Sequence, residues 1–364
     1  MKILLLGKYG EGDIVLGPER VARELYNQFI QNKIDVTFVE YFFNDNKHYS
    51  LFEKIFGKKI ISQNHLRLGI IRIVSLIINK KINIIHLINI QRFQIVILLL
   101  KNLLGIKIVS TFHGLTKIEL KSREKTFKNR LFLDKWVESL AIRKSDILTF
   151  PSKLLLKKFR DYYKISSDNS IIIPNGISSK FNNIKNEIDF SKEFDLVFYN
   201  GSNPSINRGL KKIIEQLSLL KLIKVNLFII GYSDIHYESR NNLNIVNVGF
   251  LSHDLLVEFC KGKHFIIKSD SFDSFSIMVL ECMTIGVIPI ITRNVGIMDY
   301  VENGINGFIY DCGSMEGLLN LFRDISNGKY DLNEISDRAK KISESLNWNK
   351  IALKYYQVFK GLLN

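Results

Sequence analysis

Short apolar runs alternate with longer segments of helical periodicity in the first half of the chain. The apolar runs predict strands at Ile3–Leu6, Val36–Tyr41, Ile82–Ile88, Lys107–Thr111, Asp146–Phe150 and Ser170–Ile173. Between them, apolar residues recur at helical spacing in Arg20–Ile30 and in Phe127–Ile142. Strands that alternate with helices in this way are typical of a parallel sheet covered by helices.

The same alternation begins again after residue 190. Its strands are predicted at Leu196–Tyr199, Val225–Ile230, Ile245–Val248, Phe265–Lys268, Val287–Ile291 and Gly307–Tyr310. A helix is expected at Leu210–Leu220, after the first of them. The last segment, Trp348–Leu363, carries an apolar stripe of Ile351, Tyr355 and Phe359, so we expect it to return and cover the first domain.

Two doubly wound α/β domains are the simplest interpretation of this repeat. The 364 residues, with 46% hydrophobic content, are enough for two cores of ordinary size. Turn-forming residues from Pro174 to Asn183 separate the two periodic stretches. We therefore predict a Rossmann-like first domain at 1–175, a Rossmann-like second domain at 176–345, and a returning helix at 346–364.

Cysteine usage and apolar run length predict a cytoplasmic protein. Cys260, Cys282 and Cys312 are odd in number and far apart, which fits neither a disulfide framework nor a zinc site. The run Ile3–Leu6 is too short for the core of a signal peptide. The run Ile95–Leu100 is far shorter than a membrane-spanning helix.

Positive charge is concentrated in the first domain. Residues 1–175 carry 30 Lys and Arg against 15 Asp and Glu, whereas residues 176–364 carry 21 of each. Basic segments such as Lys121–Lys125 and Lys157–Arg160 alternate with apolar residues and Trp136, within Lys117–Lys164. This pattern favours peripheral contact with an anionic membrane at its inner face, although solvated lysines would give the same composition. No nucleic-acid-reading module is recognisable, so no nucleic acid partner is expected.

Glycine-rich loops follow the first strand of each half. In the first half, Gly7–Gly12 and Gly17 lead into a helix, where free N–H groups would favour an anion. The glycine spacing does not match the dinucleotide fingerprint, so NAD is not favoured, although Glu40 is an acidic residue at the end of the second strand, where that fingerprint expects one. In the second half, Asn207-Arg208-Gly209 opens a helix, where Arg208 would either hold a diphosphate or be an ordinary surface arginine.

Two carboxylates stand eight residues apart after the strand Phe265–Lys268. If a helix begins near Ser276, Asp273 lies in the loop before it and Glu281 lies about two turns inside it. Such a pair can meet a sugar and a ribose. Alternatively, Asp273 neighbours a helix cap and Glu281 is a buried acid with local partners.

The segment from Asp273 to Glu281 resembles the acidic signature of retaining GT-B glycosyltransferases of family 4, also called glycosyl transferases group 1. The rest of the motif follows in order, with further matches upstream, at Glu281-Cys282-Met283, Gly286, Gly296, Asn303–Gly307, Pro174–Ile177, Asn207–Gly209, Gly17-Pro18 and His113-Gly114. Asp273 replaces the usual glutamate, Ser202 stands where arginine is common, and Pro289 is shifted by one position. These departures affect the prediction of the donor's identity.

The resemblance implies a role for each matched residue. Glu281 would bond the ribose hydroxyls, Arg208 the diphosphate and Asp273 the transferred sugar. The backbone N–H groups of Phe275, Ser276 and Ile277 would face the phosphate and the sugar. Gly17 would let the first domain approach the diphosphate, and His113 would lie near the reacting centre unless it is a hydrogen-bonded core histidine.

The function implied is transfer of a sugar, with retention, from a nucleotide-sugar donor to a saccharide or lipid-linked saccharide. Such a reaction suits synthesis of cell-surface polysaccharide or lipopolysaccharide. The similar enzymes need no bound metal or other cofactor, and the sequence has no Asp-x-Asp triplet, so none is expected. Two alternatives remain: a nucleotide-sugar epimerase of the same fold, and a noncatalytic saccharide-binding relative.

Overall fold

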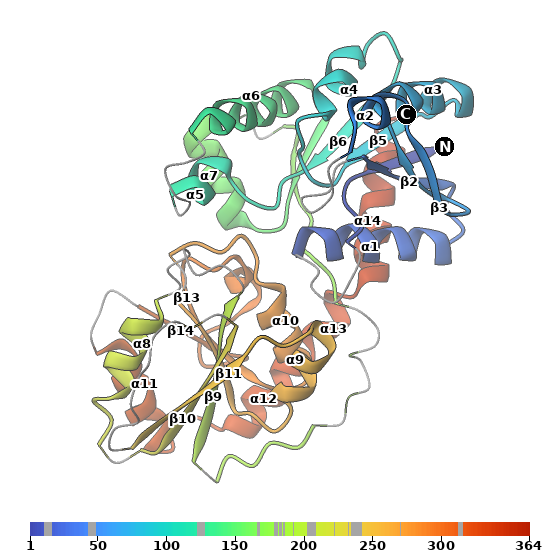
Figure 1. Cartoon of the computed structure of the whole chain (residues 1–364). Coiled ribbons are helices and arrows are strands. Elements are labelled where there is room, and N and C mark those ends of the chain that lie inside the picture. The colour runs from blue at the N-terminus through green and yellow to red at the C-terminus, as the bar shows by residue number, and fades with distance from the viewer. Residues whose placement is uncertain are drawn as a thin grey trace. The chain divides into compact units, whose positions relative to one another are not determined.

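The chain folds into two compact units, seen in a computed structural model (Figure 1). The structure describes residues 1–10, 17–42, 49–121, 128–165, 168–177, 181, 184, 186–191, 193–201, 209–221, 223–231, 233, 242–269, 271–311 and 316–364. The first unit contains Met1–Gly176 and Trp348–Asn364, and the second contains Ile177–Asn347. The chain thus passes from one unit to the other at Gly176 and again at Asn347.

The first unit is built on an eight-stranded sheet in the order β3-β4-β2-β1-β5-β6-β7-β8. Its strands are β1 (Ile3–Leu6), β2 (Val36–Tyr41), β3 (Lys58–Ser62), β4 (His65–Leu68), β5 (Ile84–Leu87), β6 (Lys107–Thr111), β7 (Ile147–Phe150) and β8 (Ser170–Ile172). All neighbours pair in parallel except β3 and β4. All six strands predicted in this half are present, which confirms the parallel sheet.

The sequence did not predict the antiparallel pair β3–β4. Strand β3 is exposed along most of its length, whereas His65 and Arg67 of β4 are buried. A charged residue inside a strand resembles loop sequence unless its partner is known. That partner is Glu40 on the neighbouring strand β2. Its Oε2 accepts hydrogen bonds from Arg67 Nε and from a terminal guanidinium nitrogen of Arg67.

Helices cover both faces of the first sheet. They are α1 (Gly17–Gln31), α2 (Leu51–Phe56), α3 (Ile70–Lys80), α4 (Gln94–Leu100), α5 (Thr116–Lys121), α6 (Lys128–Lys144), α7 (Lys153–Tyr163) and α14 (Trp348–Gly361). Helices α2, α3, α4 and α6 lie along one side of the sheet, and α1 and α14 lie on the other (Figure 1). The expected helical segments at Arg20–Ile30 and Phe127–Ile142 correspond to α1 and α6.

The C-terminal helix α14 completes the core of the first unit, as predicted. It packs against α1, and the rings of Phe29 and Phe359 lie 6.0 Å apart. Tyr355 is buried, and its hydroxyl lies 3.3 Å from Thr111 Oγ1 in β6. Residues 348–364 therefore belong to the first unit, together with residues 1–176.

The second unit is a fully parallel sheet in the order β11-β10-β9-β12-β13-β14. Its strands are β9 (Phe194–Gly201), β10 (Val225–Gly231), β11 (Leu243–Gly249), β12 (Phe265–Lys268), β13 (Ile288–Thr292) and β14 (Phe308–Tyr310). Its helices are α8 (Leu210–Leu217), α9 (His253–Cys260), α10 (Ile277–Thr284), the 3-10 helix η3 (Gly296–Tyr300), α11 (Gly317–Ser326), α12 (Leu332–Lys340) and α13 (Ile342–Ser345).

The strand order reverses at β9. On one side of β9 lie β10 and then β11, and on its other side lies β12. Open parallel sheets bind ligands at such a switch point, beyond the carboxyl ends of the strands. The core beneath it is apolar and includes Phe198, Phe265 and Phe308. Among the described residues, none of the helices is both long enough and apolar enough to span a membrane.

Candidate active site

The second unit gathers its candidate chemistry where α10 begins. Strand β12 ends at Lys268, a short loop follows, and Ser276 forms the N-cap of α10 with a left-handed φ of 70°. That conformation is rare for a residue other than glycine and, like other backbone strain, often marks a functional site. The Ser276 side chain makes no capping hydrogen bond. Polar groups of a ligand can therefore satisfy the N–H groups of the first helical turn.

Asp273 is fixed at this helix start through its backbone. Its N–H donates to the Asn294 carbonyl at 2.9 Å, and its own carbonyl accepts from the Gly296 N–H at 2.9 Å. These bonds tie the loop after β12 to the loop after β13. The carboxylate of Asp273 is thereby held at the carboxyl edge of the sheet, where a ligand is expected.

Both carboxylate oxygens of Asp273 have positively polarised partners. Oδ1 accepts the Phe275 N–H at 3.1 Å, and Oδ2 lies 3.4 Å from Lys268 Nζ. Lys268 is only 2% exposed, so its ammonium is withdrawn from solvent beside a carboxylate. Of the three predicted N–H donors, that of Phe275 is used by Asp273, whereas Ser276 and Ile277 lie at the start of the helix.

Lys268 was not identified from the sequence. It is the last residue of the buried strand β12, and its neighbours Phe265, Ile266 and Ile267 are fully buried and apolar. A charged residue at the carboxyl end of a buried parallel strand is itself a signal of a site. That signal, read together with Asp273 five residues later, would have found the pair.

Glu281 lies in the second turn of α10 and is 1% exposed. Residues 278–284 of this helix are all buried, Glu281 among them. Burial first, then Cys260 and the Glu281 carboxylate, raise the pKa of the neighbouring Cys282 thiol. Charged groups are rarely buried in this way without a structural or ligand-binding role.

A second helix start lies next to the same edge. Gly209, the N-cap of α8, has φ 80°, and a Cβ there would come within 2.5 Å of Ser269 Oγ. Only glycine fits both the backbone conformation and the space. Strands β9 and β12 are neighbours, so the N-termini of α8 and α10 approach the same switch point. Arg208, the predicted diphosphate ligand, lies outside the described residues, as does Ser202.

Thr292 ends β13 beside this site. Its hydroxyl is buried and has no hydrogen-bond partner within the described parts of the chain. Leaving a buried hydroxyl unbonded costs about 1–3 kcal/mol, so such atoms call for an explanation. Register places Ile291 opposite Lys268, so Thr292 lies close to the carboxyl end of β12.

His113 and Gly17 belong to the first unit. Gly17 is the first residue of α1, and residues 11–16 before it lie outside the described residues. The imidazole of His113 bonds to the Ile88 backbone, and its Nε2 is buried without a hydrogen-bond partner in the described chain. Burial lowers the pKa of His113 to about 4, so the ring is neutral at physiological pH.

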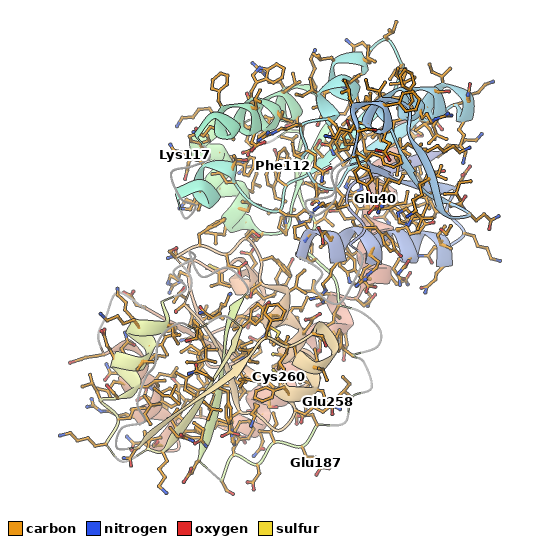
Figure 2. The ribbon with its side chains drawn as sticks, in the orientation of Figure 1. Glu40, Phe112, Lys117, Glu187, Glu258 and Cys260 are labelled. Carbon is orange, nitrogen blue, oxygen red and sulfur yellow. The ribbon has the colours of Figure 1, made fainter. Side chains whose placement is uncertain are left out.

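Glu40, the acidic residue weighed for dinucleotide binding, has a structural role in the first unit (Figure 2). Its Oε1 accepts the Tyr9 N–H at 2.6 Å, and its Oε2 lies 2.6 Å from a terminal guanidinium nitrogen of Arg67. Burial alone would raise the pKa of Glu40, but the neighbouring His65 and the hydrogen bonds from Tyr9 and Arg67 lower it overall. The carboxylate thus holds the backbone at Tyr9, after β1, and its oxygens are engaged by Tyr9 and Arg67.

Among the described residues, no three His, Cys, Asp or Glu side chains come together as a metal site would require. Cys260 and Cys282 are buried free thiols, and Cys312 lies outside the described residues.

Comparison with known proteins is consistent with this geometry. Residues 15–181 match the family model Glycosyltransferase Family 4, and residues 180–342 match Glycosyl transferases group 1. An uncharacterized glycosyltransferase of Methanocaldococcus jannaschii, MJ1178, is 24% identical over 270 residues, which is 72% of this chain and 71% of that protein.

Two solved structures share the fold at low identity. Sucrose-phosphate synthase from Thermosynechococcus elongatus has a TM-score of 0.73 at 14% identity, covering 100% of this chain and 99% of that one. HepE of Anabaena, in complex with UDP, has a TM-score of 0.71 at 14% identity, covering 99% and 100%. Because the two family matches together run from residue 15 to residue 342, the chain belongs to the GT-B glycosyltransferases that join a Family 4 domain to a group 1 domain.

Proposed function

We propose that the chain transfers a sugar from a nucleoside-diphosphate sugar to a saccharide or lipid-linked saccharide, with retention of anomeric configuration. The observation that carries the proposal is the placement of Asp273. Its carboxylate is held before the start of α10 by Lys268 and the Phe275 N–H, and Glu281 lies in that helix. Family membership supports the transfer, and HepE, solved with UDP, supports a nucleotide donor.

The diphosphate is proposed to bind at the starts of α8 and α10. A helix N-terminus carries about half a positive charge and unsatisfied N–H groups, which favour an anion. Ser276 and Ile277 would donate from α10, and Arg208, which precedes Gly209 and α8, would add a guanidinium. Lys268, at the end of β12, would add a further positive charge beside this loop and so compensate for the serine at position 202.

Asp273 is proposed to bind hydroxyls of the transferred sugar. The Lys268 ammonium and the Phe275 N–H favour its charged form and fix its orientation. Aspartate is one methylene shorter than glutamate, so its carboxylate stays closer to the helix start. The resemblance also assigns the ribose hydroxyls to Glu281, the diphosphate to Gly17 and the reacting centre to neutral His113, and these roles stay predictions.

The proposed step breaks the bond between sugar C1 and the phosphate oxygen, and its electron pair stays on the diphosphate. The acceptor hydroxyl oxygen forms a new bond to C1 on the same face of the ring. Its proton passes to the departing phosphate oxygen. The helix N–H groups and Arg208 stabilise the charge that develops on the leaving group, so no separate acid is needed. We expect no metal ion and no other cofactor.

The proposed setting is assembly of cell-surface polysaccharide or lipopolysaccharide from a cytoplasmic donor. A lipid-linked acceptor would be met at the inner face of the membrane. The excess of 30 Lys and Arg over 15 Asp and Glu in residues 1–175 supports a peripheral contact with anionic lipid there.

Product analysis tests the proposal. UDP-, GDP- and ADP-sugars are incubated with lipid-linked and free saccharide acceptors, and the new linkage is assigned by NMR. We expect one donor class to give an acceptor-dependent, retained product, and Asp273→Asn to lower kcat by about 100-fold. Asp324→Asn, which removes an exposed partner of Lys329, is the matched control and should leave kcat unchanged.

Other products would contradict the proposal in different ways. An inverted linkage would refute retention. An epimerised donor without acceptor-dependent product would establish the epimerase alternative. Binding of saccharide with neither transfer nor donor hydrolysis would establish a noncatalytic role.

A further inference from the structure

Four helices on one side of the first unit present large apolar side chains to solvent. These helices, α2, α3, α4 and α6, are here called the helix row (Figure 1). Helix α2 packs on α3, and α4 packs on α6. Of the 20 exposed large apolar side chains in the described parts of the chain, 12 lie within residues 51–136, on the row and its connections. They are Leu51, Phe52, Phe56, Ile60, Ile71, Ile78, Val96, Leu99, Leu103, Phe132, Leu133 and Trp136.

Helices α3 and α4 each carry two apolar stripes. On α3, Ile73 and Ile77 face the sheet and are buried, whereas Ile71 and Ile78 are exposed on the outer side. On α4, Ile97 and Leu98 are buried, while Val96 and Leu99 are exposed. A helix that only covers a sheet needs one apolar stripe. The outer stripes therefore indicate a second apolar environment that these helices contact.

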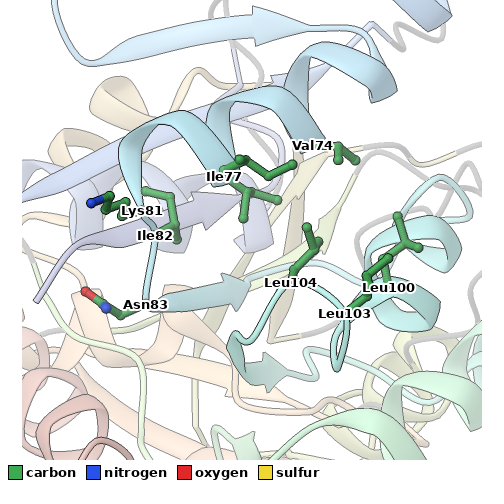
Figure 3. A pocket seen from close by; sticks show the side chains of 9 residues that line it. Val74, Ile77, Lys81, Ile82, Asn83, Leu100, Leu103 and Leu104 are labelled. Atoms are coloured by element: carbon green, nitrogen blue, oxygen red, sulfur yellow. The ribbon is translucent and has the colours of Figure 1, made fainter.

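The two outer stripes meet in an open apolar groove. One part of the groove, about 550 Å³, is lined by Val74, Ile78, Leu100, Leu103 and Leu104, with Lys81 at its rim (Figure 3). An adjoining part, about 460 Å³, shares Val74, Ile78 and Leu100 and continues to Ile71 and Val96. Exposed apolar surfaces of this kind mark interaction sites.

The charge around the groove is positive on balance. Residues 51–107 contain ten Lys and Arg but a single acidic residue, Glu53, which is engaged in the capping box of α2. Four of the ten pair with carboxylates from other segments: Arg67 with Glu40, Arg92 with Asp134, and Lys101 and Lys107 with Asp146. Arg72, Lys80 and Lys81 are exposed beside the apolar stripes. A second copy of this chain would bring the same cations face to face. An anionic bilayer instead offers both apolar chains and phosphate headgroups.

We infer that the helix row docks on an anionic lipid bilayer, its apolar side chains entering the acyl boundary and its lysines and arginines meeting the phosphates. Interfacial helices bury their apolar face about 5–10 Å into that boundary. The inference rests on the proposed function only in that a lipid-linked acceptor requires the enzyme at a membrane. It adds which surface makes the contact.

This surface differs from the one that the sequence favoured. Within Lys117–Lys164, helix α7 turns Leu155, Leu156 and Phe159 inward, so it has no outer apolar stripe. Much of Lys121–Lys125 lies outside the described residues. Only α6, with Phe132, Leu133 and Trp136, belongs to both regions.

Vesicle binding tests the inference, and a tryptophan reports it. The protein is mixed with phosphatidylglycerol–phosphatidylcholine vesicles and with pure phosphatidylcholine vesicles, and partitioning is measured by co-sedimentation. Of the two tryptophans, Trp348 is buried and Trp136 is 40% exposed on the helix row. We expect binding to the anionic vesicles alone, a blue shift of Trp136 emission, and weakening by added salt.

Paired variants separate the two contributions. Leu99→Gln with Leu103→Gln should reduce partitioning at least about tenfold, since both side chains leave the acyl boundary. Lys80→Gln with Lys81→Gln should reduce it about tenfold or more. The matched controls are Leu219→Gln with Leu255→Gln in the second unit, and Lys350→Gln with Lys354→Gln at α14, all exposed. These should bind as wild type does, and Leu103→Gln alone serves if the double leucine variant does not fold.

Several results would overturn the inference. Equal binding to both kinds of vesicle would do so, as would unchanged partitioning of the double leucine variant. A dimer that dissociates in the leucine variant, or RNA binding in place of vesicle binding, would also overturn it. Nucleotide binding is measured on the same samples. Nucleotide binding without vesicle binding would refute the docking surface alone, and vesicle binding without any nucleotide binding would refute the proposed donor site alone.

Discussion

Glu40 illustrates how one carboxylate organises a loop, a strand and a hairpin of the first unit. It bonds Tyr9 in the loop after β1 and Arg67 in β4, and it lies 3.8 Å from His65 Nε2. All three groups favour its ionised form. Removing one partner of a buried ion pair leaves the other without compensation, which costs about 3–5 kcal/mol.

Glu40→Gln should therefore lower the free energy of unfolding of the first unit by about 3 kcal/mol at neutral pH. The pKa of Glu40 is lowered on folding, so its contribution is complete above the unfolded pKa and is lost as pH falls through the folded pKa. The difference from wild type should thus shrink below about pH 4. Urea unfolding followed by tryptophan emission measures it, because Trp136 and Trp348 both belong to this unit.

Asp134→Asn is the matched control. Asp134 also pairs with an arginine, Arg92, but both side chains are about 40% exposed. Exposed pairs contribute about 0.2–1 kcal/mol. If the two variants lost equal stability, burial of the Glu40 cluster would not be the reason for its contribution.

Asp273 and Glu281 could be predicted as candidates because they lie eight residues apart in one segment, a spacing that is visible without three-dimensional information. Lys268 was missed although a charged residue at the end of a buried strand is visible in the sequence, and only the folded chain shows that it lies 3.4 Å from Asp273. Thr292 was missed for a related reason, since a buried hydroxyl without a partner is visible only in the folded chain.

At the scale of elements, Gly209 joins α8 to the site. Gly209→Ala meets both an unfavourable positive φ and a close contact with Ser269. Gly262 also has a positive φ, 72°, but a Cβ there meets nothing within 4 Å. We expect Gly209→Ala to lower the stability of the second unit by at least about 1 kcal/mol more than Gly262→Ala does. Urea unfolding followed by circular dichroism compares them, and equal losses would show that Ser269 gives way freely.

Strand positions were predictable because parallel strands are apolar runs buried on both faces. All twelve predicted strands are present, and their ends differ by a few residues. The pair β3–β4 was not predictable, since its polar positions depend on Glu40 from another strand. The sequence contains the apolar residues of both stripes on α3 and α4, but it does not indicate which stripe faces the sheet.

At the scale of the whole molecule, the first unit depends on the last helix of the chain. Helix α14 buries Trp348, Ile351, Ala352, Tyr355 and Phe359. Loss of even one large core side chain costs about 3–5 kcal/mol, and a domain has only about 5–15 kcal/mol in total.

Truncation after Asn347 should therefore abolish cooperative unfolding of the first unit. Emission of Trp136, which remains, would report this in a urea titration. Truncation after Gly361 removes only residues beyond α14 and should leave the transition in place. A cooperative transition of wild-type midpoint in the shorter protein would show that α14 is dispensable.

The second unit is proposed to bind the nucleotide of a sugar donor, with Glu281 as the predicted partner of the ribose. The most direct test is the thermal shift produced by UDP, GDP and ADP on wild type, Glu281→Gln and the control Glu258→Gln, which changes the exposed partner of Lys261. One nucleotide at 100 times its Kd should stabilise wild type and the control by about 2.7 kcal/mol, and Glu281→Gln should lose most of that gain. An equal shift in all three proteins, or no shift with any nucleotide, would contradict the claim.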